Sequence, residues 1–206
     1  MTQHFVHLHL HTEYSIIDST VRIPALMRQC KDMGMSAVAL TDHCNLFAMV
    51  KFYQQALKVG LKPIIGVDLK LADHDNLDRP TTLILLCRDQ QGYHNLTKLV
   101  TKTFLDGQYR GVPMVERDWL TRKSCEGLIA LSGAIHGDVG RALVSNHYDV
   151  ADKRLASWLD VFGDRFYLEL VRSGRDEEEK YVQSVLGLAS SMSVPVVASN
   201  DVRFLK

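Results

Sequence analysis

Residues 36–68 read SAVALTDHCNLFAMVKFYQQALKVGLKPIIGVD, and this stretch is the strongest indication of the fold. The short apolar run at 36–40 predicts a buried strand, and KPIIGVD at 62–68 predicts another. Between them, 46–59 predicts a helix. Its apolar face is expected to consist of Leu46, Met49, Val50, Tyr53 and Leu57. Two buried strands joined by a helix indicate parallel pairing.

The same alternation continues on both sides of this unit. Further strands are predicted at 5–10, 82–87, 127–131, 166–171 and 194–199, and further helices at 23–33, 92–104, 137–146, 149–161 and 176–192. No GxGxxG follows the first strand, which argues against a dinucleotide-binding fold. Seven strands, most of them separated by helices, favour an α/β fold of the distorted (βα)7 TIM-like barrel type over an open doubly wound sheet.

Composition excludes several classes of protein. The chain has 206 residues, with 24 basic and 24 acidic side chains, so it is large enough for one large domain or two small ones. A net charge of zero disfavours a module that only grips nucleic acid by its phosphates. The four cysteines form no CxxC pair, which fits free thiols in a reducing cytoplasm. The longest apolar runs have about five residues, too few to span a membrane.

Histidines crowd the start of the chain. Four of the nine lie in the first eleven residues, namely His4, His7, His9 and His11. Alternate residues on a strand share one face, so His7, His9 and His11 are expected together, with Leu8 and Leu10 on the opposite face. Imidazoles need polar partners and are the commonest metal ligands in proteins, so this face predicts a metal site.

Carboxylates fall near the ends of other predicted strands. Asp42 and His43 follow the strand at 36–40, and Asp68 ends the next strand. Asp201 follows the last strand, and Asp18 lies shortly after the first. In a parallel barrel these ends converge on one mouth. A mixed set of imidazoles and carboxylates suits zinc, manganese or iron, and two or three such ions would clamp a phosphate ester and supply a hydroxide.

Each carboxylate also has a purely structural interpretation. Asp18 could cap the following helix, and Asp42 could cap a turn. Asp68 could be solvated at a strand end, and Asp201 could pair with Arg203. Taken singly, these roles are favoured. The joint placement of acidic and imidazole groups at several strand ends favours the metal site.

Several segments resemble the PHP (polymerase and histidinol phosphatase) family. HLHLHTEYSIID at 7–18 and TDH at 41–43 are similar to its opening motifs. Longer segments at 45–69, 89–104, 126–133, 164–174 and 194–205 resemble the N-terminal domain of bacterial DNA polymerase III alpha subunits of the proteobacterial type. The resemblance covers the whole chain. It implies that residues 1–206 are a PHP domain, the N-terminal fragment of a much longer polymerase chain, with a distorted seven-stranded barrel. No helical pattern follows the last strand, so truncation of the barrel at its C-terminus is expected.

The resemblance also implies a ligand set. Metal-competent members of the family hold three ions with nine ligands, and the matching positions here are His9, His11, Asp18, His43, Asp68 and Asp201. Asp68 replaces the usual glutamate and is shorter by one methylene. The three remaining positions hold Thr82, Ala134 and Arg203, which are expected to be vestigial. Arginine stays charged and has no lone pair to offer a metal. The site is therefore expected to bind zinc, manganese or magnesium at reduced occupancy, or no metal.

Three functions follow from the resemblance. The first is a scaffold domain that docks the proofreading exonuclease subunit of the polymerase III core, and the second is an active metal-dependent phosphoesterase, either a 3′–5′ exonuclease or a pyrophosphatase. The third, a stand-alone phosphatase, is disfavoured by the long polymerase-like segments. DNA-directed DNA polymerase chemistry, with contacts to DNA and the sliding clamp, would belong to the rest of the alpha subunit in the cytoplasm. No catalytic residue of that reaction is expected within this fragment.

Overall fold

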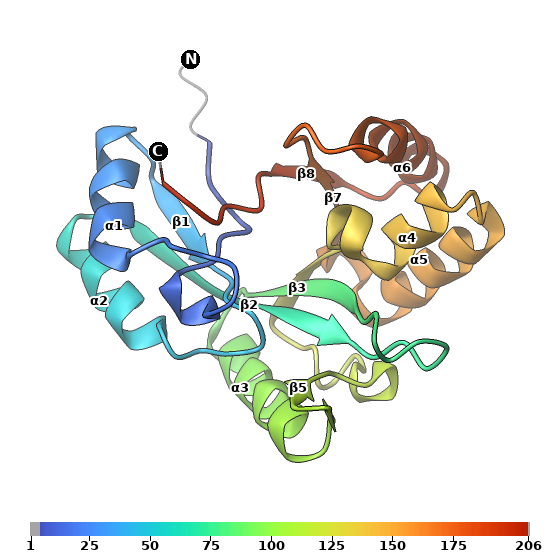
Figure 1. The fold of residues 1–206 in the computed structure, drawn as a ribbon, viewed down its shortest axis with the longest axis horizontal. Helices are drawn as coiled ribbons and strands as arrows, with labels where there is room; N and C mark the ends of the chain where they lie inside the picture. The colour runs from blue at the N-terminus through green and yellow to red at the C-terminus, as the bar shows by residue number, and fades with distance from the viewer. Residues whose placement is uncertain (1–4, 206) are drawn as a thin grey trace.

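The structure, a computed structural model, describes residues 5–205. Its centre is a six-stranded sheet that curls into a half-barrel, with the strand order β1-β2-β3-β6-β7-β8 (Figure 1). These strands are β1 (Ala37–Leu40), β2 (Lys62–Leu71), β3 (Thr81–Cys87), β6 (Leu128–Leu131), β7 (Phe166–Val171) and β8 (Val196–Ser199). The α/β class with a curled sheet agrees with the sequence prediction.

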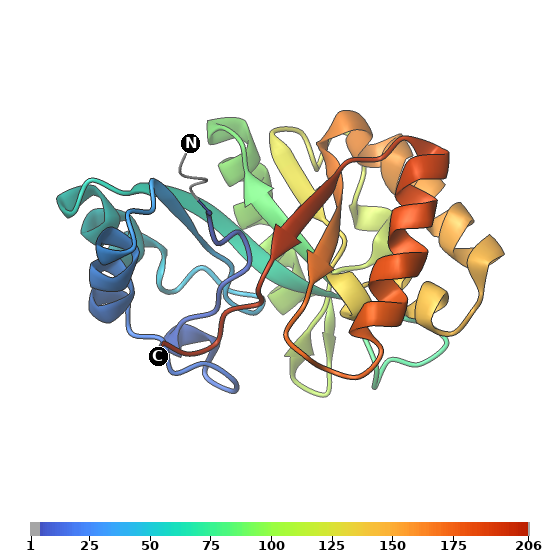
Figure 2. The same cartoon turned by 90° about the horizontal axis from the view of Figure 1, so that it is seen from above.

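Helices cover the outside of the sheet. Figures 1 and 2 show α1 and α2 on one side of the half-barrel, α4, α5 and α6 on the other, and α3 between the two groups. Their bounds are α1 (Ile23–Asp32), α2 (Met49–Lys58), α3 (Gln90–Leu105), α4 (Asp138–Val144), α5 (Tyr148–Phe162) and α6 (Glu178–Met192). Each predicted helix is confirmed to within three residues at either end. A small hairpin of β4 (Gln108–Tyr109) and β5 (Val112–Pro113) was not predicted.

The prediction of an all-parallel sheet is wrong at one strand. β3 runs antiparallel to both β2 and β6, whereas the pairs β1–β2, β6–β7 and β7–β8 are parallel. The cause is the connection between β2 and β3, a loop at 72–80. A parallel crossover needs a dozen or more residues, usually including a helix, whereas this shorter loop turns the chain straight back.

The prediction of a strand at 5–10 is also wrong, because this segment does not form a regular strand. The segment at 7–11 instead fills the space between β1 and residue 202. Ala39 N donates to His7 O and Thr41 N donates to Leu10 O, at 2.8 and 2.9 Å. On the other side, His11 N donates to Val202 O and Val202 N donates to His9 O, at 2.9 and 3.1 Å. The segment therefore connects the two edges of the curled sheet.

A bend at His9 explains why regular alternation fails there. Leu8 packs with the residues inside the half-barrel, and Leu10 packs with the core beneath α1 and α2. The two leucines thus point to different cores instead of sharing one face. His7 lies beside Phe5, with ring centroids 5.0 Å apart, and does not join His9 and His11.

The predicted apolar face of α2 is correct at Leu46 and Met49, which pack against the core, but wrong at Val50, Tyr53 and Leu57. The buried residues of this region are Ala48, Phe52 and Ala56, which follow one another at helical spacing. Val50 and Leu57, by contrast, are 59% and 55% exposed. The helix has two apolar faces, and the one with two alanines packs inward because small side chains let the helix approach the sheet closely.

Two further sequence expectations concern composition. All four cysteines are free thiols. Within residues 5–205, no helix is long and apolar enough to cross a membrane.

Candidate metal centre

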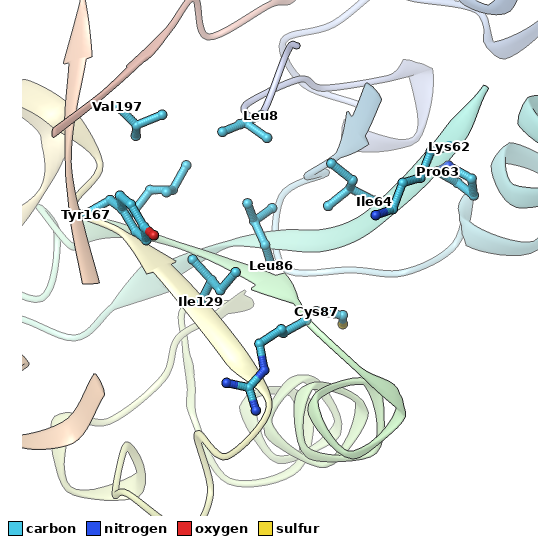
Figure 3. A pocket seen from close by; sticks show the side chains of 11 residues that line it. Leu8, Lys62, Pro63, Ile64, Leu86, Cys87, Ile129, Tyr167 and Val197 are labelled. Carbon is cyan, nitrogen blue, oxygen red and sulfur yellow. The ribbon is translucent and has the colours of Figure 1, made fainter. Parts of the chain in front are cut away.

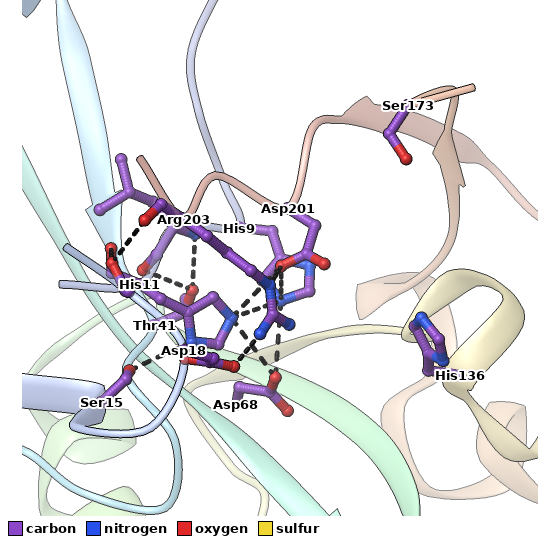
Figure 4. A network of polar contacts seen from close by, with 12 residues as sticks. His9, His11, Ser15, Asp18, Thr41, Asp68, His136, Ser173, Asp201 and Arg203 are labelled. Carbon is purple, nitrogen blue, oxygen red and sulfur yellow. Dashed lines mark hydrogen bonds and ion pairs between the residues drawn. The ribbon is translucent and has the colours of Figure 1, made fainter. Parts of the chain in front are cut away.

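The structure brings all six predicted ligand residues together at one mouth of the half-barrel (Figure 4). His9 and His11 come from the segment beside β1, and Asp18 comes from the loop that precedes α1. His43 follows β1, and Asp201 follows β8. Asp68 does not end its strand as predicted. It lies inside β2, because pairing with β3 continues as far as Leu71 and Thr81.

One group of donors consists of His9, His11 and Asp201. The two Nε2 atoms of the histidines are 3.1 Å apart. Asp201 Oδ1 lies 3.6 Å from His9 Nε2 and 3.5 Å from His11 Nε2. These three ligand atoms lie within 4.8 Å of one another, close enough to hold one metal ion.

A second group consists of His11, Asp18 and His43, again with ligand atoms within 4.8 Å. His43 Nε2 lies 2.7 Å from Asp18 Oδ2, and His43 Nδ1 lies 3.2 Å from Asp68 Oδ2. Asp68 Oδ2 is also 3.6 Å from the Nε2 atoms of His9 and His11, so this carboxylate stands between the two groups.

The donor set fits a divalent metal ion. Asp18 Oδ1 and Asp68 Oδ1 are buried and have no hydrogen-bond partner among the described residues. Buried polar atoms without partners are rare in native structures and often mark an ion. Imidazole with carboxylate suits zinc or manganese. When bound there, such an ion would supply a Lewis acid and an activated water.

Arg203 enters the same cluster. Its Nε donates to Asp201 Oδ1 at 3.0 Å, and its Nη1 contacts Asp18 Oδ2. The side chain is three-quarters buried, so its permanent charge faces both groups of donors from a fixed position. The contact between Asp201 and Arg203, which the sequence suggested as the structural role of Asp201, is therefore present. Asp18 does not cap α1, whose N-cap residue Arg22 makes no side-chain capping bond.

Burial and neighbouring charges push the pKa values of the cluster apart. Burial lowers the pKa of His9, but the Glu169 and Asp68 carboxylates outweigh burial and raise it well above its usual value. Burial holds the pKa of His11 well below its usual value, despite the opposing effect of Asp68. Burial raises the pKa of Asp68, but the hydrogen bonds and charges of His43 and His9 outweigh it and bring that pKa well below its usual range.

Sequence reasoning missed Glu169. This residue lies in β7, is fully buried, and its Oε1 lies 2.9 Å from His9 Nδ1. Ser199 Oγ donates to the same oxygen. Such a carboxylate fixes the ring of His9 so that Nε2 faces the other donors. The signal was a lone glutamate inside the apolar run FYLELV, where an unpaired charge would be costly.

Asp42 has the structural role that was considered for it. Its carboxylate accepts hydrogen bonds from Thr12 N at 2.6 Å, Thr12 Oγ1 at 2.8 Å and Ser15 Oγ at 2.8 Å. These bonds hold the turn η1 (Glu13–Ser15), which positions the loop that carries Asp18. Asp42 is thus fully occupied by protein donors.

Two of the three positions at which the family's usual ligand is replaced, Thr82 and Ala134, lie beside each other on another part of the mouth. Thr82 is the second residue of β3, and Ala134 begins the turn η3 (Ala134–His136) after β6. Gly133 packs so closely on Thr82 that a Cβ there would lie 2.6 Å from the Thr82 carbonyl oxygen. His136, at the end of η3, lies away from the cluster in Figure 4. The alanine methyl offers no ligand, so the cluster of donors is concentrated around His9, His11 and His43.

Comparisons with known proteins agree with this geometry. The family model of the PHP domain matches residues 7–173. The chain is 44% identical over 206 residues to the DNA polymerase III subunit alpha of Pseudomonas fluorescens and 41% identical over 201 residues to that of Escherichia coli K12. The two alignments cover 100% and 98% of this chain, but only 18% and 17% of the relatives' own length. The chain therefore spans less than a fifth of the length of these curated relatives.

Solved structures show the same fold at low sequence identity. A proposed metal-dependent phosphoesterase from Bifidobacterium adolescentis is 14% identical, with a TM-score of 0.65 over 98% of this chain and 88% of that one. An amidohydrolase from Chromobacterium violaceum is 13% identical, with a TM-score of 0.64 over 97% and 87%. With the family match over most of its length, the resemblance seen in the sequence is confirmed, and the chain belongs to the PHP domain family.

Proposed function

We propose that the chain is the PHP domain of a cytoplasmic DNA polymerase III alpha subunit and works there mainly as a scaffold. In this role it docks the proofreading exonuclease subunit and supports the rest of the alpha subunit. Polymerisation and the contacts with DNA and the sliding clamp belong to the remainder of that longer chain. The whole-chain likeness to alpha subunits at 41–44% identity supports this proposal.

The contact of Arg203 with Asp18 and Asp201 is the observation that favours a scaffold over an enzyme. The guanidinium neutralises two carboxylates that a metal ion would otherwise need. Together with Thr82 and Ala134, it leaves a partly degenerate site in which His9, His11, Asp18, His43, Asp68 and Asp201 hold zinc, manganese or magnesium at reduced occupancy or not at all.

Two measurements test the scaffold proposal. Elemental analysis of the purified full-length protein should find fewer than three metal ions per chain. Isothermal titration calorimetry should detect association with the exonuclease subunit, and chelation of metal should leave that association unchanged. Three fully occupied metals, or no association, would contradict the proposal.

A second candidate function is metal-dependent phosphoester hydrolysis, either of a DNA 3′ end or of pyrophosphate. The convergence of His9, His11 and Asp201 within 4.8 Å favours it. Manganese-stimulated hydrolysis should then disappear in His9→Ala and His43→Ala. Unchanged hydrolysis in these variants would assign the activity to a contaminant.

A further inference from the structure

Helix α2 carries an apolar face that the described fold leaves in solvent. Its inner face, with Phe52 and Ala56, is fully buried. Its outer surface exposes four large apolar side chains, namely Phe47 just before the helix, Val50, Tyr53 and Leu57. Single exposed apolar residues are ordinary, but a contiguous set on one helix marks an interaction surface.

A groove adjoins this face because the layer of helices has a gap. Consecutive strands of the main sheet are joined through helices at every described connection except that between β2 and β3, which is the loop at 72–80. Helix α2 packs on β2 and α3 packs on β3, so a gap is left between these two helices. Between α2 and α3 lies a groove of about 610 Å³, lined on its apolar side by Met49, Tyr53, Ile65 and Tyr93.

The charges around the groove are mainly positive. Arg88 lines it, and Lys58 and Lys62 are exposed at the neighbouring ends of α2 and β2. Asp89 is the one acidic residue in the lining. Its carboxylate accepts from Gly92 N at the start of α3 and pairs with Arg88. This pair offsets the charge of Arg88 as well, so the positive charge left for a partner is that of Lys58 and Lys62, and it complements acidic side chains.

A second apolar pocket continues from the groove. It lies inside the half-barrel, at the end opposite to the metal centre, and has a volume of about 510 Å³. Figure 3 shows Leu8, Ile129, Tyr167 and Val197 converging on it, with Pro63 at its edge. The pocket and the groove share three lining residues, Pro63, Cys87 and Arg88. Barrel interiors are normally packed with side chains, so this one has room for an apolar anchor from outside.

We infer that the groove between α2 and α3, together with the exposed outer face of α2 that adjoins it at Tyr53, docks an amphipathic helix of a partner protein. The apolar stripe of that helix lies against Val50, Tyr53 and Leu57, and its acidic flanks face Lys58, Lys62 and Arg88. An apolar residue at one end of the helix enters the adjoining pocket. Helix-in-groove binding requires this combination of apolar anchors at helical spacing and charged flanks. The inference rests on the proposed docking function and places it away from the metal centre.

The test uses the full-length protein and the proofreading exonuclease subunit as the probe. Leu57→Glu should weaken the complex at least about 30-fold in calorimetry, because it places a charge within the apolar contact. Arg88→Glu should slow association and reduce its sensitivity to salt. Leu186→Glu is the matched control, since Leu186 is also an exposed leucine but lies on α6. This control should bind as the unaltered protein does.

Hydrogen exchange of the complex gives an independent readout, and α2 and the start of α3 should gain protection. The possible results separate the two proposals. Absence of any complex with the unaltered protein would overturn both the docking function and this inference. A complex of normal affinity in Leu57→Glu and Arg88→Glu, with protection elsewhere, would overturn the inference alone. Binding to phosphatidylglycerol vesicles that Leu57→Glu abolishes would identify a membrane surface instead and would also overturn it.

Discussion

At the scale of single residues, Arg203 decides how much positive charge the candidate metal centre already holds. The side chain contacts Asp18 and Asp201, which belong to different donor groups. A divalent ion must therefore displace the guanidinium or bind beside it, and either course weakens binding.

Arg203→Gln should strengthen binding of Mn²⁺ or Zn²⁺ by about tenfold or more, because the competing charge is gone. Titration calorimetry of the metal into chelator-treated protein measures the change. Arg175→Gln is the matched control, since Arg175 lies beside His136 and approaches the cluster at Asp201 Oδ2, 3.9 Å away, and is half exposed. An equal gain in both variants would mean that general charge, and not the position of Arg203, controls affinity.

The pKa of His9 predicts how metal-free stability depends on pH. Because the pKa is raised in the folded state, folding favours the proton on His9. The resulting stabilisation is fully present below pH 6.5, the ordinary value, and is lost as the pH rises through the folded pKa. Urea unfolding in EDTA should therefore show His9→Gln losing most stability relative to the unaltered protein at low pH and least at high pH. A difference that is constant from pH 5 to pH 9 would refute the prediction.

At the scale of elements, the close approach of α3 to the turn before β6 depends on two glycines. A Cβ on Gly92 would lie 1.9 Å from the carbonyl oxygen of Gly127, which is backbone and cannot move aside cheaply. Gly127 itself has φ +74°, a conformation that favours glycine. The start of α3 can therefore pack where it does only without a side chain at 92.

Gly92→Ala should lower the free energy of unfolding by about 1–3 kcal/mol through this overpacking. Gly187→Ala, inside α6 and with nothing within 4 Å of the new Cβ, should raise it by about 0.5–1 kcal/mol. Urea denaturation of the two variants checks both signs. Equal effects would show that helix propensity alone, and not packing on Gly127, governs position 92.

Sequence periodicity was sufficient to locate the elements but not to orient them. The apolar spacing of α2 marked a helix correctly, yet two apolar faces competed and the one with Ala48 and Ala56 packed inward. The reversal of β3 depended on loop length, which apolar periodicity does not report. The chemical motifs led to His9, His11 and His43 because imidazoles near strand ends are conspicuous. Glu169 lies inside a strand, and its role is evident only from its contact with His9, which is distant in the sequence.

At the scale of the whole molecule, the segment at 7–11 joins the two edges of the half-barrel. It bonds to β1 through His7 and Leu10 and to Val202 through His9 and His11. These bonds hold His9 and His11 beside Asp201, so the closure of the sheet also assembles the candidate metal centre.

Val202→Pro should therefore affect both stability and metal binding. Proline removes the N–H that donates to His9 O, at a cost of about 1–3 kcal/mol in the free energy of unfolding. Thermal unfolding and metal titration measure the two effects. Retention of full metal affinity in a destabilised variant would show that the donors assemble without this closure.

The bridge between Leu10 and Val202 also has a consequence in time. The paired residues lie roughly 190 positions apart in the chain. At ribosomal rates of about 5–20 residues per second, His9 and His11 are made roughly 10–40 s before Asp201 and Arg203 exist. During that interval the two imidazoles lack the Asp201 carboxylate as a neighbour. Among the residues of this cluster Arg203 is made last, so its charge is the final one to reach Asp18.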